Sequence, residues 1–515
     1  MFSDGVGTMS WDVAKICWSY LPMYKATPTC FQIRMGGAKG MLAVDGRLTG
    51  RRIQVRPSMI KFATADMQDL EICETGSRPV PLYLNRQMIK ILEDLGIPDE
   101  WFFKVQRAGI ERIRSVTAKP SNTAKFLRGV NVCESIALHR LIRYCGRMGI
   151  DYRADRFLCS IVEAVVLREL RLLKHKARIP IDKGITLYGV MDETGYLAPN
   201  EVFITFDLEK GRDPLPAERI PILVTRSPAL YDGDVQQVYS AIPPEGHPLT
   251  HLRNCIVFSR RGQRDLPGQL SGGDLDGDIY NIIWDEEAVP KATYPPADYP
   301  RVEPIKLDRP VEKEDIADFF IDFMRTDHLG IIANRHLILA DQMEEGTHHP
   351  DCKKLAELHS TAVDFSKTGI PVKMEELPRA NTFRPDLWVP SYSDVLFFFF
   401  FFVLTACSMA PGPVAHVFDK SVIELDEYIV RQPYDEDEDL RPPSKYYKSD
   451  KILGRLYRAV DEREVWHENV RARPLVNGPS FWDGFIRSCV IRCREMGVPV
   501  RWTHRTDEAR RIRTA

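Results

Sequence analysis

The stretch Ser271-Gly272-Gly273-Asp274-Leu275-Asp276-Gly277-Asp278 is the most informative part of this sequence. Three carboxylates within five residues repel one another, so holding them together is costly unless a cation neutralises their charge. In an extended chain, residues i, i+2 and i+4 point to the same side, and glycines let a loop bend so that side chains converge. Mg²⁺ prefers oxygen ligands and often shares them with substrate phosphates. The loop therefore predicts a Mg²⁺ site, with Mn²⁺ as the alternative ion, formed by Asp274, Asp276 and Asp278.

Two simpler interpretations of this loop are a calcium loop and a solvated acidic turn. The EF-hand pattern fails, because Ile279 and Asp285 stand where that pattern has Gly and Glu, and strands are expected on both sides. A solvated turn stays open as an alternative, although apolar strand-like runs on both sides weaken it. Two metal ions held by the carboxylates would suit nucleotidyl transfer, which depends mainly on positioning and charge neutralisation.

Outward from the loop, the chain alternates between strand-like and helical regions. Residues 1–80 contain short apolar runs separated by Gly and Asp turns, which is typical of strands. Residues 81–184 carry apolar residues at three- and four-residue spacing, which predicts helices. Strand signals return in residues 185–300, and helical patterns dominate residues 301–515. A chain of 515 residues is too long for one core, so several domains are expected.

Composition excludes little. The formal net charge is −2, from 70 Lys+Arg against 72 Asp+Glu, which leaves a nucleic-acid enzyme with local basic patches open. The 11 cysteines include no CxxC pair, so reduced thiols in a nuclear or cytoplasmic protein are expected.

An apolar segment at 395–410 contains six consecutive phenylalanines, Phe397 to Phe402. Its length falls short of the ~20 residues that span a bilayer, and it lacks a basic flank, so no membrane partner is expected. We interpret residues 389–408 as an insert, with a translated intron as the hypothesis and a buried core helix as the alternative. A mature transcript that retains this stretch would contradict the intron hypothesis.

At Gly272 to Asp278 the sequence resembles the eukaryotic cellular RNA-dependent RNA polymerases of gene silencing, whose signature is a DxDGD loop. Further blocks resemble the same family in the same order, over most of residues 2–380 and again near Lys445 to Tyr457. They are Phe2-Ser3-Asp4-Gly5-Val6-Gly7, Gln32 to Gly40, Arg56-Pro57-Ser58-Met59, Leu84-Asn85-Arg86-Gln87, Gly189 to Gly195, Val224 to Pro228, Asp327 to Asn334 and His359 to Gly369.

The resemblance implies an α+β multidomain fold with two double-psi β-barrels, as in multisubunit RNA polymerases. The first barrel would use residues 1–80 and be left incomplete, because the family's catalytic region begins upstream of this match. A helical linker would follow at 81–184, the catalytic barrel with the Asp triad at 185–300, and a helical neck and head region at 301–515.

The resemblance also places Lys39 opposite the carboxylates, where a lysine can neutralise triphosphate charge. On residues alone, Lys39 is an ordinary turn lysine, since its loop lacks P-loop spacing. Arg226, Asn334 and Lys367 are further candidates for binding nucleotide, template or RNA backbone. For Arg226, a structural salt bridge is the competing interpretation.

The implied activity is synthesis of double-stranded RNA from single-stranded RNA templates, with nucleoside triphosphates as substrates and proteins of a silencing complex as partners. A DNA-templated RNA polymerase and a catalytically impaired RNA-binding scaffold remain alternatives. Template competition would separate the two polymerases, and a scaffold has no need of metal at Asp276.

Overall fold

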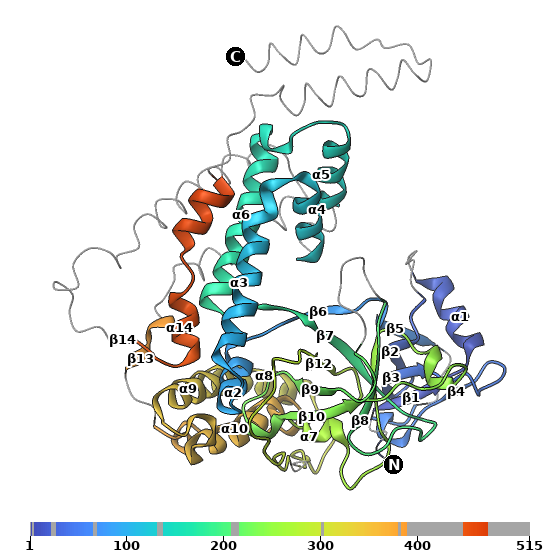
Figure 1. The fold of residues 1–515 in the computed structure, drawn as a ribbon. Helices are drawn as coiled ribbons and strands as arrows, with labels where there is room; N and C mark the ends of the chain where they lie inside the picture. Colours follow the sequence, from blue (N-terminus) through green and yellow to red (C-terminus); the bar gives the residue numbers. More distant parts are fainter. Residues whose placement is uncertain are drawn as a thin grey trace, which may run out of the picture. The chain divides into compact units, whose positions relative to one another are not determined.

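The computed structural model describes Phe2 and residues 5–21, 27–64, 69–130, 137–207, 216–299, 303–379, 383–388 and 446–471. These residues form two compact units (Figure 1). The first unit takes its residues from 1–106, 177–388 and 445–457, and the second from 107–176, 389–444 and 458–515. The expected insert at 389–408 lies outside the described residues. The domain boundaries inferred from the sequence stay predictions.

A closed barrel forms the centre of the first unit. Its six strands are β7 (Pro180–Met191), β8 (Glu201–Thr205), β9 (Pro221–Arg226), β10 (Val235–Ser240), β11 (Cys255–Phe258) and β12 (Ile279–Ile283). The strand order is β11-β8-β10-β9-β12-β7, and β11 also pairs with β7, which closes the ring. Two of the pairings, β7 with β11 and β8 with β10, are parallel, and the others are antiparallel. Closure leaves no free edge in the ring, and β6 (Val80–Tyr83) pairs with β7 outside it.

The barrel interior is a close-packed apolar core. It includes Leu187, Val224, Ile256 and Tyr280, which are at most 2% exposed. Gly189 on β7 leaves room for the Tyr280 ring, because a Cβ at this glycine would lie 2.5 Å from Tyr280 Cε2. The ring of Tyr280 is thereby brought under the loop that precedes β12.

A second sheet of five strands lies against this core. Its strands are β1 (Val6–Met9), β2 (Cys30–Met35), β3 (Ala38–Val44), β4 (Ile53–Gln54) and β5 (Leu70–Thr75), in the order β4-β1-β3-β2-β5. Among the described residues this sheet stays open, because no strand joins β4 to β5. This open sheet occupies the residues for which the sequence predicted a first barrel left incomplete, and that assignment stays a prediction.

The two faces of the five-stranded sheet bury different cores, as the two-residue period of a strand requires. Met41 and Ala43 of β3 pack into the barrel core, whereas Leu42 and Val44 pack with helix α1 (Trp11–Tyr20) on the other face. Val6 and Cys30 join the barrel core from β1 and β2. The sheet and the barrel consequently share one hydrophobic core.

Helices complete both units. The remaining helices within the first unit are α2 (Arg86–Asp94), α7 (Leu266–Gln269), α8 (Lys313–Thr326), α9 (Leu329–Gln342), α10 (Pro350–Val363) and α11 (Phe365–Thr368), with the short pair β13 (Arg384–Pro385) and β14 (Tyr446–Tyr447). The second unit holds α4 (Pro120–Gly129), α5 (Leu138–Arg147), α6 (Arg156–His175) and a π-helix at Glu464–Arg471, and α3 (Asp99–Ser115) and α14 (Ile452–Arg458) have residues in both units. Within the part of the chain that the structure describes, no helix is both long and apolar enough to cross a membrane.

Candidate functional site

The acidic loop connects α7 to strand β12 of the barrel. Ser271 and Gly272 adopt left-handed backbone conformations, with φ of 53° and 64°, and turn the chain back on itself. Gly277 has φ of 134°, and a Cβ there would lie 2.2 Å from Gln32 Nε2 on strand β2. Glycine at this position permits both the positive φ and the close approach of the Gln32 side chain.

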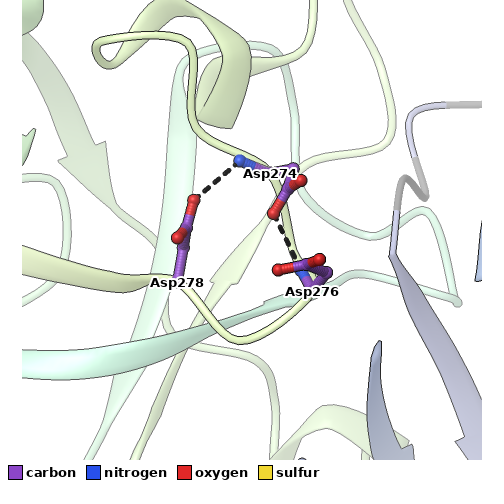
Figure 2. A group of neighbouring side chains, drawn as sticks. All are labelled: Asp274, Asp276 and Asp278. Carbon is purple, nitrogen blue, oxygen red and sulfur yellow. Dashed lines mark hydrogen bonds between the residues drawn. The ribbon is translucent and has the colours of Figure 1, made fainter. Parts of the chain in front are cut away.

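The three aspartates of the loop converge (Figure 2). Each offers a carboxylate oxygen, and these oxygens all lie within 4.8 Å of one another. Asp274 Oδ1 accepts a hydrogen bond from the Asp276 amide at 3.1 Å, and Asp278 Oδ2 accepts one from the Asp274 amide at 2.9 Å. Tyr280 fixes the same loop from below, since its hydroxyl donates to the Asp274 carbonyl at 2.6 Å. A compact set of hard oxygen donors of this kind suits Mg²⁺ or Mn²⁺.

Burial and mutual repulsion make the three carboxylates unequal. Burial, followed by the charges of Asp276 and Asp278, raises the pKa of Asp274 to about 6. Burial also opposes ionisation of Asp276, but the hydrogen bond and charge of Lys39 outweigh it and lower the pKa of Asp276 below its usual value. The cluster thus gains stability from any cation placed near Asp274.

Lys39 reaches the cluster from strand β3 of the five-stranded sheet. Its Nζ lies 2.9 Å from Asp276 Oδ2, and its side chain is 42% exposed. The backbone at Gly5 lies against the loop as well, because a Cβ at this position would be 2.6 Å from Asp276 Cβ. Lys39 thus lies on the five-stranded sheet and the aspartates on the loop before β12 of the barrel, and the fold brings them into contact.

Arg226, at the end of strand β9, holds the other end of the cluster. Its Nε and Nη2 lie 2.7 Å and 3.2 Å from the two carboxylate oxygens of Asp278, and its Nη1 donates to the Ser271 carbonyl at 3.1 Å. Burial opposes its charge, but Asp278 outweighs burial and raises the pKa of Arg226. The salt bridge expected as the competing interpretation for Arg226 is therefore present.

Arg226→Met should lower the free energy of unfolding by about 2 kcal/mol or more, because it leaves the half-buried Asp278 carboxylate without its cation. Arg226→Lys should lose less, since it keeps the charge but not the two-pronged geometry. Denaturant unfolding of both variants in metal-free buffer measures the difference. Arg226→Lys as stable as the unaltered chain would contradict a role for the guanidinium geometry.

Lys367 and Asn334, the other two candidates from the sequence, differ in their relation to the aspartate cluster. Lys367 on α11 pairs with Asp364 at 3.0 Å, and this hydrogen bond, with smaller contributions from Asp274 and Asp276, raises the pKa of Lys367. Asn334 is exposed on helix α9. The roles of both residues stay predictions.

Lys61 is a cation near the cluster that sequence reasoning missed. Its charge helps to lower the pKa of Asp276, and its backbone amide donates to the Gly37 carbonyl at 2.8 Å, in the turn that precedes strand β3 and Lys39. It follows Arg56-Pro57-Ser58-Met59 by two residues, so proximity to that block was the only signal for it.

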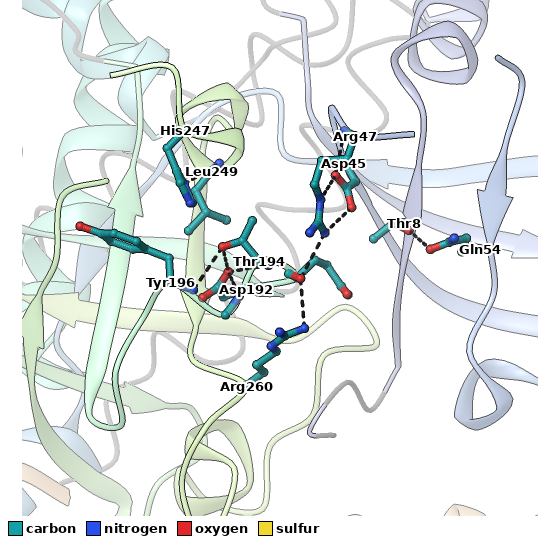
Figure 3. A network of polar contacts seen from close by, with 12 residues as sticks. Thr8, Asp45, Arg47, Gln54, Asp192, Thr194, Tyr196, His247, Leu249 and Arg260 are labelled. Atoms are coloured by element: carbon teal, nitrogen blue, oxygen red, sulfur yellow. Dashed lines mark hydrogen bonds and ion pairs between the residues drawn. The ribbon is translucent and has the colours of Figure 1, made fainter. Parts of the chain in front are cut away.

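A polar network also joins the five-stranded sheet to the barrel (Figure 3). Arg47 and Arg260 both donate to the Glu193 carbonyl at 3.1 Å. Arg56 forms two 2.7 Å hydrogen bonds with the Glu193 carboxylate. Asp192, which is fully buried, accepts amide hydrogen bonds that hold the turn after β7. The Gly189 to Gly195 block thus connects the barrel to the five-stranded sheet through hydrogen bonds.

The fold that carries this site is similar to the solved structure of the RNA dependent RNA polymerase QDE-1 from Thielavia terrestris. The TM-score is 0.61 and the identity 22%, over 84% of this chain and 53% of that chain. At this identity the similarity shows the fold, and the α+β class with double-psi β-barrels predicted from the sequence is confirmed.

The profile of the family described as RNA dependent RNA polymerase matches residues 1–460. This chain therefore belongs to the RNA-dependent RNA polymerase family. It is 30% identical to the probable RNA-dependent RNA polymerase 2 of Oryza sativa subsp. japonica, over 92% of this chain and 43% of that protein. It is 34% identical to RNA-dependent RNA polymerase 1 of Arabidopsis thaliana, over 72% and 33%. It is 31% identical to RNA-dependent RNA polymerase 1 of Schizosaccharomyces pombe, over 73% and 32%. The chain spans about a third to two fifths of the length of these relatives.

Proposed function

We propose that this chain carries the catalytic site of an RNA-dependent RNA polymerase that makes double-stranded RNA from single-stranded templates in gene silencing. The observation that carries the proposal is the contact between an aspartate cluster on the closed barrel and Lys39 on the neighbouring sheet. Phosphoryl transfer between nucleotides requires negative charge to be neutralised on both the attacking and the leaving side. A site with anionic groups on one wall and a cation on the other supports that chemistry.

Asp274, Asp276 and Asp278 would hold Mg²⁺, because their oxygens are close together and of the donor type that this ion prefers. A bound pair of such ions supplies activation of the 3′-hydroxyl and stabilisation of the pyrophosphate leaving group. Lys39 would bind the triphosphate of the incoming nucleotide, assisted by Lys61. Arg226 would keep Asp278 oriented toward the other carboxylates through its two-pronged salt bridge.

The ion pairs within the site also predict that one protein cation exchanges its carboxylate partner for a phosphate group. Two of the three carboxylates are paired with a cation of the protein, Asp276 with Lys39 and Asp278 with Arg226. Lys39 is the more exposed of the two cations and carries a flexible side chain, so it is the one able to leave its carboxylate for a phosphate.

The experiment is incorporation of a labelled nucleotide on a single-stranded RNA template with Mg²⁺, with single-stranded DNA as competitor template. Product that RNA competes away and DNA does not supports the proposal, and the reverse would assign a DNA-templated polymerase. Binding of Mn²⁺ is measured in parallel. A chain that incorporates no nucleotide and binds no Mn²⁺ but retains RNA is the scaffold alternative, and that result would overturn the proposal.

A basic face on helix α5 supports RNA as a partner. Arg140, Arg143 and Arg147 are exposed and spaced by three and four residues, which places them on one face of the helix. Helix α4 adds the exposed Lys125 and Arg128, and neither helix contains Asp or Glu. Exposed cations gathered on one helix face are typical of a surface that binds the phosphate backbone.

Replacing Arg140, Arg143 and Arg147 together by Gln should weaken RNA binding and reduce the slope of log K against log salt by about 2, since each lost phosphate contact removes roughly 0.7 for single strands. Fluorescence anisotropy with labelled RNA across a salt series measures both quantities. The matched control replaces three exposed lysines on separate elements, Lys15, Lys313 and Lys373. An unchanged slope in the arginine variant, or an equal loss in the control, would contradict binding by this face.

A further inference from the structure

The turn Asp232-Gly233-Asp234 lies between strands β9 and β10. It is a single turn of 3-10 helix, and both of its carboxylates are buried, with exposed fractions of 0% and 1%. Buried carboxylates are costly unless their oxygens are fully hydrogen-bonded. The partners of these two side chains therefore indicate what the turn does.

Asp234 accepts four hydrogen bonds, and they divide between its two oxygens. Oδ2 accepts from the amides of Leu230 and Tyr231, at 3.1 Å and 3.0 Å, which closes its own turn. Oδ1 accepts from the Ser271 amide at 3.1 Å and from the Tyr299 hydroxyl at 2.6 Å. One carboxylate thus ties the turn to the first residue of the acidic loop.

The peptide groups of Ser271 link Asp234 to the aspartate cluster. The Ser271 amide donates to Asp234, and the Ser271 carbonyl accepts from Arg226 Nη1, whose other nitrogens hold Asp278. Ser271 has a left-handed φ of 53°, a conformation that a non-glycine residue keeps only where its surroundings impose it. The Asp234 hydrogen bond is one such constraint, and it fixes the direction in which the Ser271 carbonyl points.

Further contacts hold this arrangement in place. Tyr299 packs against the loop, because a Cβ at Gly272 would lie 3.2 Å from Tyr299 Cβ. On the other side of the turn, Asp232 is paired with His348 at 2.7 Å and Lys353 at 3.1 Å, which come from the helical region. Asp232 therefore anchors the turn, while Asp234 faces the loop.

We propose that Asp234 is a positioning residue for the metal-binding carboxylates: its hold on the Ser271 amide aims the Ser271 carbonyl at Arg226 and so fixes Asp278 relative to Asp274. This inference rests on the proposed function only in taking the aspartate cluster to be the metal site. Asp234 itself touches neither the cluster nor a substrate. Groups that orient metal ligands in this way typically contribute roughly 10- to 100-fold in metal affinity or activity.

Asp234→Asn removes the hydrogen bond between the Ser271 amide and Asp234 and leaves the others in place. The amide oxygen of Asn can still accept from Leu230 and Tyr231, and the Tyr299 hydroxyl can turn to accept from the Asn NH₂ group. The Ser271 amide then faces a donor and loses its acceptor. The turn keeps its own hydrogen bonds, while the contact to the loop is broken.

The control is Asp232→Asn, which also neutralises a buried carboxylate of the same turn but makes no contact with the loop. Both variants should lower the melting temperature. Only Asp234→Asn should weaken the affinity for Mn²⁺, read from the electron paramagnetic resonance signal of the free ion, by roughly 10-fold or more. In nucleotide incorporation, it should lower kcat with little change in KM for the nucleotide.

Asp234→Glu provides a second variant that keeps the charge, in case the Asn variant does not fold. The extra methylene cannot leave both pairs of hydrogen bonds in place, so a loss of Mn²⁺ affinity of roughly 5-fold or more is expected. Mn²⁺ affinity within about twofold of the unaltered chain in the folded Asp234 variants, or an equal loss in Asp232→Asn, would overturn the inference and leave the proposed function standing. An unaltered chain that does not bind Mn²⁺ would overturn both.

Discussion

Asp276→Asn should reduce nucleotide incorporation by roughly 10²- to 10³-fold or more, the largest effect expected from a single substitution in this chain. Asp276 is the central carboxylate of the cluster, and it is the one in contact with Lys39. Asn keeps the shape of the side chain but removes the negative charge that a divalent cation requires. Mn²⁺ binding should fall together with activity, because both depend on the same oxygen atoms.

Asp308→Asn is the matched control for this prediction. Asp308 is exposed and lies outside the cluster, so its substitution removes one negative charge without altering the site. Activity within about twofold of the unaltered chain is expected. If Asp276→Asn retained Mn²⁺ affinity and activity, the aspartate cluster would not be the catalytic metal site.

Lys39→Met should separate metal binding from catalysis. Removing the ammonium group 2.9 Å from Asp276 leaves the cluster more negative, so Mn²⁺ should bind as tightly as before or several-fold more tightly. Incorporation should nevertheless fall by roughly 10²-fold, because the group expected to neutralise the triphosphate is gone. A rise in KM for the nucleotide should account for part of this loss.

The control is Lys15→Met, which removes an exposed lysine from helix α1 of the same sheet region. The opposite directions expected for Lys39→Met, metal affinity upward and activity downward, distinguish a phosphate-binding lysine from a merely structural one. Weaker Mn²⁺ binding in Lys39→Met would indicate that the salt bridge holds Asp276 in place for the metal, and the proposed role would be wrong.

The acidic loop could be recognised from the sequence because its chemistry is local. The spacing of Asp274, Asp276 and Asp278 and the glycines around them lie within seven residues, so short-range geometry was enough to predict their convergence. The order of strands and helices along the chain could be predicted for the same reason, because apolar periodicity is also a local pattern. The place of Lys39 opposite the loop came from family resemblance, since no local pattern relates it to residues more than 200 positions away.

What escaped prediction depends on long-range contacts. Asp232 and Asp234 have the composition of an exposed turn, and only the packing of β9, β10, the loop and the helices buries them. Lys61 acquires its proximity to Asp276 from the hydrogen bond of its backbone to Gly37. The incompleteness of the first barrel was expected only from the family resemblance, because the closing of a barrel depends on which strands meet at its edges and no local pattern shows it.

The shared core of the sheet and the barrel limits how the site can move. Met41 and Ala43 are buried among barrel residues, so pulling the sheet away from the barrel would expose apolar surface and break the Glu193 contacts. The sheet that carries Lys39 and the barrel loop that carries the aspartates are therefore expected to keep a fixed spacing. Under the proposed function, an RNA strand would pass between these two parts of the site without their moving apart.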